Sequence, residues 1–127
     1  MRRAVMVALG SFLLIAGLFL FCDGARRGAS MELQAICRQM RALAEEGKTE
    51  ELADVVQKAR ARWQEKEEAL SFITHHSLTD AVREMMIQIE TALQYGNLFE
   101  LIMGIEGLRE AAVALHQQDA FLLKNVL

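Results

Sequence analysis

The chain has 127 residues, of which 53% are apolar, and it carries 14 basic against 17 acidic side chains, a formal charge of -3. When the four Arg and one Asp of the first thirty residues are set aside, ten basic and sixteen acidic residues remain in residues 31–127, a charge near -6. Such an acidic domain is poorly suited to binding phosphate backbones, so we expect no nucleic-acid partner. Two cysteines exclude a disulfide-rich scaffold, and the lack of proline favours an all-α fold.

An uncharged apolar run near the N-terminus, Ala4–Cys22, dominates the hydropathy pattern. A helix of about 20 apolar residues crosses the hydrocarbon core of a bilayer, whereas the apolar region of a signal peptide has only about 7 to 15 residues. Residues 1–22 are therefore predicted to be a transmembrane signal anchor, with the lipid bilayer as its partner. Cleavage after Gly24 is the alternative interpretation.

Arginines flank the anchor on both sides, which nearly balances the positive-inside bias. Arg2 and Arg3 precede the apolar run, and Arg26 and Arg27 follow it. A short basic leader before the first apolar helix usually stays in the cytoplasm. We therefore expect a single-pass protein of the cell membrane whose remaining domain is extracytoplasmic.

Residues 23–30, DGARRGAS, are small and polar, so they are predicted to be a linker that leads into a helical domain of residues 31–127. Ser30 is the expected N-cap of the first helix of that domain, and Gly47 is its expected end. Because Cys37 lies on the apolar face of this helix, a buried, inert thiol is expected rather than a disulfide with Cys22. The apolar residues recur at steps of three and four: Leu33, Ile36, Cys37, Met40, Leu43 and Ala44.

Thr49 is the expected N-cap of a second, long helix. Its charged stretch, Arg60–Leu70, is typical of a solvated face, so Glu65, Glu67 and Glu68 are not interpreted as a paired-carboxylate site. The expected core residues of this helix are Leu52, Val55, Val56, Ala59, Trp63, Leu70 and Ile73.

Two capping patterns bound the remaining helices. Ser77 and Asp80 match a capping box and place the turn between the second and third helices, while Gly96 ends the third. Asn97 with Glu100 repeats the pattern at the start of the fourth. The expected core residues are Leu78, Val82, Met85, Ile89, Ala92 and Leu93 in the third helix, and Leu98, Leu101, Ile102, Ile105, Leu108, Ala112 and Leu115 in the fourth.

Small residues make the fourth helix locally thin. Gly104, Gly107 and Ala111 predict a close helix contact or a bend there. The periodicity loosens around residues 117–119, so residues 120–127 are expected to form a short final turn. The methionines on or beside the apolar faces are expected to fill the core: Met40, Met85, Met86 and Met103.

The predicted connections are only a few residues long, which requires neighbouring helices to run antiparallel. The sequence therefore predicts an all-α fold, an N-terminal transmembrane helix followed by an up-and-down antiparallel four-helix bundle.

The histidines are the one group of residues that suggests a chemical site. His75 and His76 are adjacent and cannot share one helical face, and His116 lies far away in the sequence. A zinc site needs three or four ligands, and no phosphate-binding loop, nucleophile elbow or metal-binding motif is present. We therefore expect no enzyme activity, no cofactor and no catalytic, cofactor-binding or metal-ligating residues. A metal or small-ligand sensor that uses His75 and His76 is the alternative hypothesis.

Three short motifs resemble an uncharacterised bacterial family of short, membrane-anchored helical proteins, known as domain of unknown function 4363. They are Trp63, the step Phe72–His75 and the closing residues Leu123–Leu127. The chain departs from the family at His76 and Ser77, where the family more often has one histidine followed by an acidic residue. The resemblance implies a location and a shape, and no chemistry.

Together these patterns predict a non-enzymatic, single-pass membrane protein. Its extracytoplasmic bundle is expected to serve as a protein-interaction or structural module of the bacterial envelope. The expected partner is another envelope protein or a second copy of the chain.

Overall fold

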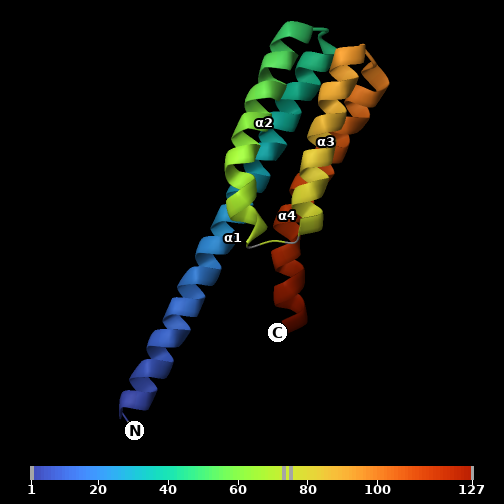
Figure 1. The fold of residues 1–127 in the computed structure, drawn as a ribbon. Coiled ribbons are helices and arrows are strands. Elements are labelled where there is room, and N and C mark those ends of the chain that lie inside the picture. The colour runs from blue at the N-terminus through green and yellow to red at the C-terminus, as the bar shows by residue number, and fades with distance from the viewer. Residues whose placement is uncertain (1, 73, 75, 127) are drawn as a thin grey trace.

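The computed structural model describes residues 2–72, 74 and 76–126, and the side chains as far as residue 117. These residues form four helices and no strand (Figure 1), so the predicted all-α class is confirmed for the described chain. The helices are α1 (Arg2–Glu45), α2 (Thr49–Ser71), α3 (His76–Tyr95) and α4 (Leu98–Val126).

The predicted linker between anchor and bundle is wrong. Residues 23–30 are helical and lie within α1, which runs unbroken for 44 residues. Ser30 is therefore no N-cap; it is buried, and its hydroxyl donates a hydrogen bond to the carbonyl oxygen of Ala112 in α4 at 2.5 Å. Glycine inside a helix costs only about 1 kcal/mol relative to alanine, an amount that burial of the apolar Ala29 and Leu33 against the bundle offsets.

Glycine ends α1 and α3 as predicted. Gly47 and Gly96 have φ angles of 72° and 66°, the left-handed conformation that glycine adopts with least strain. In each case the next residue bonds back to a carbonyl five positions earlier, Lys48 N to Leu43 O at 3.0 Å and Asn97 N to Ala92 O at 2.9 Å. The carbonyl groups at both helix ends are thereby satisfied.

The helix starts follow the predictions less closely. Asn97 caps α4 as expected, because its Oδ1 accepts a hydrogen bond from the Glu100 amide at 3.1 Å. The N-cap of α2 is Lys48 rather than Thr49, with no side-chain capping bond. α3 already begins at His76, so Ser77 lies inside its first turn and is not the N-cap. α4 continues to Val126, so the separate final turn is also wrong.

Each helix packs against two others: α1 and α3 both contact α2 and α4. The predicted apolar faces are confirmed as the core, except that Leu98 is 61% exposed and that Ile73 lies outside the described residues. The most enclosed apolar side chains come from all four helices: Cys37, Met40, Leu52, Val82, Ile89, Ile105, Leu108 and Leu115.

The thin region of α4 lies directly against α3, which confirms the predicted close contact. A Cβ atom added at Gly104 would sit 2.9 Å from Cγ1 of Ile89, closer than real contacts allow. A Cβ atom at Gly107 would collide with the sulfur of Met85. Glycine at both positions lets the two helix backbones approach.

Candidate interaction surface

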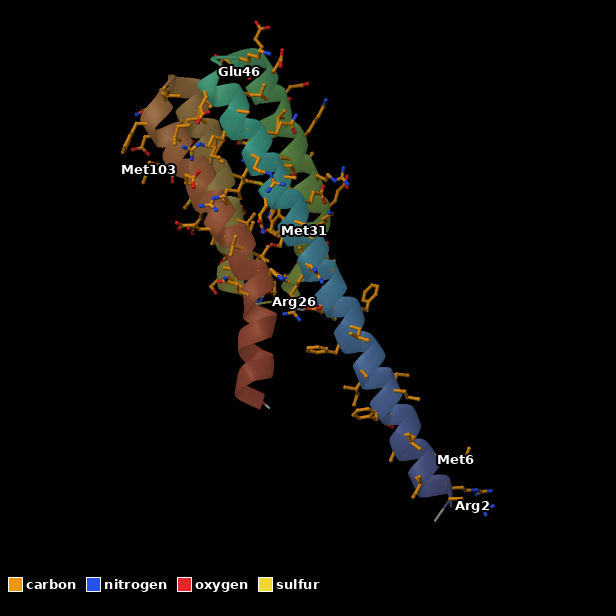
Figure 2. The ribbon with its side chains drawn as sticks, turned by 180° about the vertical axis from the view of Figure 1, so that it is seen from behind. Arg2, Met6, Arg26, Met31, Glu46 and Met103 are labelled. Atoms are coloured by element: carbon orange, nitrogen blue, oxygen red, sulfur yellow. The ribbon has the colours of Figure 1, made fainter. Side chains whose placement is uncertain are left out.

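The N-terminal part of α1 projects away from the other helices and contributes no side chain to the hydrophobic core. Its most apolar 18-residue window has a mean hydropathy of 2.6, and none of that window is buried. Figures 1 and 2 show this segment leaving the bundle near Arg26 and ending at Arg2. By length and composition, α1 is able to cross a membrane.

Ion pairs on the sides of the bundle join neighbouring helices. Arg60 of α2 donates to Glu90 of α3 at 2.5 Å, and Arg83 of α3 donates to Glu67 of α2 at 3.1 Å. Three further pairs link α1 to its neighbours: Glu32 with Arg62, Glu32 with Lys66, and Arg41 with Glu106. Glu67 therefore holds two helices together, which agrees with its interpretation as part of a charged face.

The Arg41 guanidinium, and with it Arg109, lowers the pKa of the Glu106 carboxyl. The side chains of this group are partly exposed to solvent. Exposed ion pairs contribute little, about 0 to 1 kcal/mol each. Of these pairs, Arg41 with Glu106 links α1 to α4, whereas Arg109 with Glu106 lies within α4.

Cys37 is buried between α1 and the rest of the core, and neither it nor Cys22 forms a disulfide. Burial, reinforced by Glu106, raises the pKa of the Cys37 thiol from 9.0 to about 12. Since only the thiolate is a nucleophile, this side chain is chemically inert at neutral pH, as the sequence predicted.

The histidines do not converge on a site in the described chain. His76 begins α3 and His116 lies in α4, and both side chains are exposed. His75 lies outside the described residues. Among the residues that are described, no three His, Cys, Asp or Glu side chains are grouped so as to hold a metal ion.

Trp63 is buried in the core, and its indole N–H meets no acceptor among the described residues. The cavity beside it has a volume of about 10 Å³ and is lined by residues of α1 and α2. That space admits one water molecule and nothing larger.

Exposed apolar side chains gather instead at the end of the bundle remote from the N-terminus. Tyr95, Leu98, Phe99 and Met103 are 77%, 61%, 71% and 53% exposed, and we call them the distal patch. They come from the last turn of α3 and the first two turns of α4, on either side of the Gly96–Asn97 turn. Figure 2 shows Met103 at the outer edge of the bundle, at the same end as Glu46 and far from Met6.

Two hollows adjoin the distal patch. One, of about 400 Å³, runs along α3 and α4 and is lined by Gln88, Thr91, Ala92, Tyr95, Asn97 and Glu100. The other, of about 230 Å³, lies between the two turns at this end and is lined in part by Gly47, Thr49, Leu52, Gly96 and Leu98. Apolar side chains beside a polar-rimmed hollow are the usual anatomy of a protein-binding surface.

The sequence reasoning missed this surface because it assigned Met103 and Leu98 to the core. Met40 and Met86 are buried as predicted, but Met103 is not. The sequence did contain a signal for this surface. The three- and four-residue steps that define the core faces of the helices do not include Tyr95, Phe99 and Met103. Large apolar residues outside the buried face, clustered around one turn, indicate a contact surface.

Comparisons with protein-family models, curated proteins and solved structures give no match to this chain. The resemblance to domain of unknown function 4363 thus stays a hypothesis.

Proposed function

We propose that this protein is a non-enzymatic, single-pass membrane protein whose extracytoplasmic, up-and-down four-helix bundle binds a second protein of the bacterial envelope through the distal patch. The apolar segment of α1 is the anchor. The bundle is a rigid stalk that holds the binding surface away from the lipid.

The distal patch is the observation that carries this proposal. Four large apolar side chains face water at one place, and leaving them so is unfavourable by about 25 cal/mol for each Å² of apolar surface. They provide two aromatic rings and a methionine, the side chains that most often anchor protein interfaces. The patch also lies at the opposite end of the bundle from the apolar segment, so a membrane would leave it accessible.

The length of the uncharged run Ala4–Cys22 supports retention of the anchor over removal of a signal peptide, whose apolar region has only about 7 to 15 residues. Cleavage after Gly24 would fall inside a continuous helix, two residues before Arg26 enters the bundle.

Site-specific photo-crosslinking in intact membranes tests the proposal. A photoreactive amino acid in place of Phe99 should crosslink to one discrete partner protein. The matched control is the same amino acid in place of Glu110, which is exposed on α4 about three helical turns nearer the anchor and on the same face. Equal crosslinking at both positions, or none at Phe99, would contradict the proposal; a product of twice the chain mass would identify a second copy as the partner.

The alternative, a sensor that binds metal through His75 and His76, predicts a different result. Calorimetric titration of the protein with zinc should then give heat that disappears in the double variant His75→Ala, His76→Ala. Under our proposal the two proteins give the same titration.

A further inference from the structure

The opposite end of the bundle, next to the apolar segment of α1, also has unusual features. Because α1 is one unbroken helix, the bundle cannot tilt freely on a linker and its lower end stays at a fixed height above the membrane span. Only about four residues, or about 6 Å of helix, separate Cys22 at the end of the span from the buried Arg26. This end of the bundle therefore lies at the level of the lipid headgroups.

The register of α4 against α1 places the C-terminal part of α4 below the lipid headgroups, closer to the centre of the membrane than the end of the bundle. The Ser30 hydroxyl meets the Ala112 carbonyl at 2.5 Å, and from there both helices run toward the end of the molecule that carries the N-terminus (Figure 1). Cys22 lies eight residues from Ser30, and Ala120 lies eight residues from Ala112, about 12 Å in each helix. Residues 120–126 thus reach the depth of the membrane span.

The sequence of this segment suits that depth. Residues 120–126 read AFLLKNV, with five apolar residues, one charge and one amide. Transfer of such apolar residues from water into the lipid interface is favourable. The segment is too short to cross a bilayer by itself.

Phe72 gives a second, independent observation at the same end. Its side chain is 83% exposed, the largest exposure among the large apolar residues of the described chain. The ion pairs of Glu32 with both Arg62 and Lys66 set residue 64 level with residue 32, so Phe72 lies level with Gly24. An exposed phenyl ring at headgroup depth is typical of interfacial contact.

We infer that residues 120–126 of α4, together with Phe72, form a second membrane contact that holds the base of the bundle against the lipid surface beside α1. This inference rests on the proposed anchoring of α1. It adds a partner surface that the N-terminal span does not include, and it implies that the bundle stands on the membrane at three points.

Spin labels in the full-length chain, reconstituted in vesicles of phosphatidylcholine and phosphatidylglycerol, test the inference. Single labels are introduced by Phe72→Cys and Leu122→Cys in a Cys22→Ala background, where the buried Cys37 does not react. Leu14→Cys, in the middle of the span, is the lipid reference, and Tyr95→Cys, 77% exposed at the far end of the bundle, is the water reference. Circular dichroism confirms that each labelled chain keeps its helix content.

The readout is the accessibility of each label to oxygen, which concentrates in lipid, relative to a water-soluble nickel chelate. We expect an oxygen-to-nickel ratio several-fold higher at Leu122 and Phe72 than at Tyr95, approaching that at Leu14. If the label at Leu122 or Phe72 matches Tyr95 while Leu14 is in lipid, the second contact is refuted and the anchor stands. If Leu14 itself is accessible to nickel, both the anchor and the second contact fail.

Discussion

Ser30 and Ala112 are 82 residues apart in sequence, yet the Ser30 hydroxyl donates a buried hydrogen bond to the Ala112 carbonyl oxygen at 2.5 Å. Gln34 in turn donates to the Ser30 oxygen at 3.1 Å. This bond joins α1 to α4 four residues from Arg26, where α1 leaves the bundle, and so relates the register of α4 to that of α1.

Replacement of Ser30 tests that connection. Ser30→Ala should lower the free energy of unfolding by about 1 kcal/mol, the typical net contribution of one intramolecular hydrogen bond. For a domain of this size such a loss lowers Tm by about 4–8 °C. Thr91→Ala, at an exposed position on α3, is the control and should stay within about 0.5 kcal/mol of the parent. If the two variants are equally stable, the hydrogen bond contributes nothing to the free energy of unfolding.

The two glycines of α4 should respond differently to alanine. At Gly104 the added Cβ meets the buried, β-branched Ile89 at 2.9 Å, so we expect Gly104→Ala to destabilise the bundle by about 1–3 kcal/mol through overpacking. At Gly107 the obstacle is Met85, a flexible side chain that can move aside, while alanine gains about 1 kcal/mol of helix propensity. Gly107→Ala should therefore be close to neutral. Thermal unfolding of both variants measures the difference, and the reverse order would disprove the packing argument.

Cys37 should make stability depend on pH in the alkaline range. Its pKa is about 12 in the folded chain against 9.0 as the unperturbed value, so the unfolded state loses the proton first. Stability is unaffected below pH 9 and falls as the pH rises toward 12, by about 1.4 kcal/mol per pH unit at most. The measurement is Tm between pH 8 and 11 for the parent and for Cys37→Ala, which should show a shallower decline. Parallel curves would contradict the assigned burial.

The distal patch should be dispensable for folding and required for binding. Phe99→Glu combined with Met103→Glu places charges where the side chains already face water, so we expect Tm to change by less than about 3 °C. Recovery of the crosslinked partner from membranes should fall at least tenfold, because carboxylates at the centre of an apolar interface would be desolvated. If the double variant still recovers the crosslinked partner, the binding surface lies elsewhere on the protein.

Retention of the anchor has a direct chemical test. Mass spectrometry of the protein isolated from membranes should give the intact N-terminus, and alkaline carbonate should fail to release it, because about 20 apolar residues hold it in the hydrocarbon core. A mature chain that begins at Ala25 and is recovered in the soluble fraction would establish the signal-peptide interpretation instead.

Local chemistry made much of the fold predictable from the sequence. Glycine at positions 47 and 96 marked the ends of α1 and α3 because other residues are strained at positive φ, and Asn97 marked the start of α4. Steps of three and four residues identified the buried faces, Trp63 and Val82 among them, because one side of each helix must avoid water. The glycines at positions 104 and 107 predicted a close helix contact, because a residue without a side chain lets a neighbouring helix approach.

Other features depend on packing between distant segments, which no local pattern encodes. The segment 23–30 has the composition of a linker, yet it is helical and packs on the bundle: Arg26, Ala29 and Ser30 are buried, and Ser30 bonds to Ala112 of α4. Leu98 follows the core periodicity, but it is the first residue of α4 and lines an open hollow at the end of the bundle, so it stays 61% exposed. The sequence by itself therefore determined which faces are apolar and where α1 and α3 end. Only the tertiary structure decided which apolar residues are left exposed, at the distal patch and at Phe72, because exposure depends on where the partner helices stop.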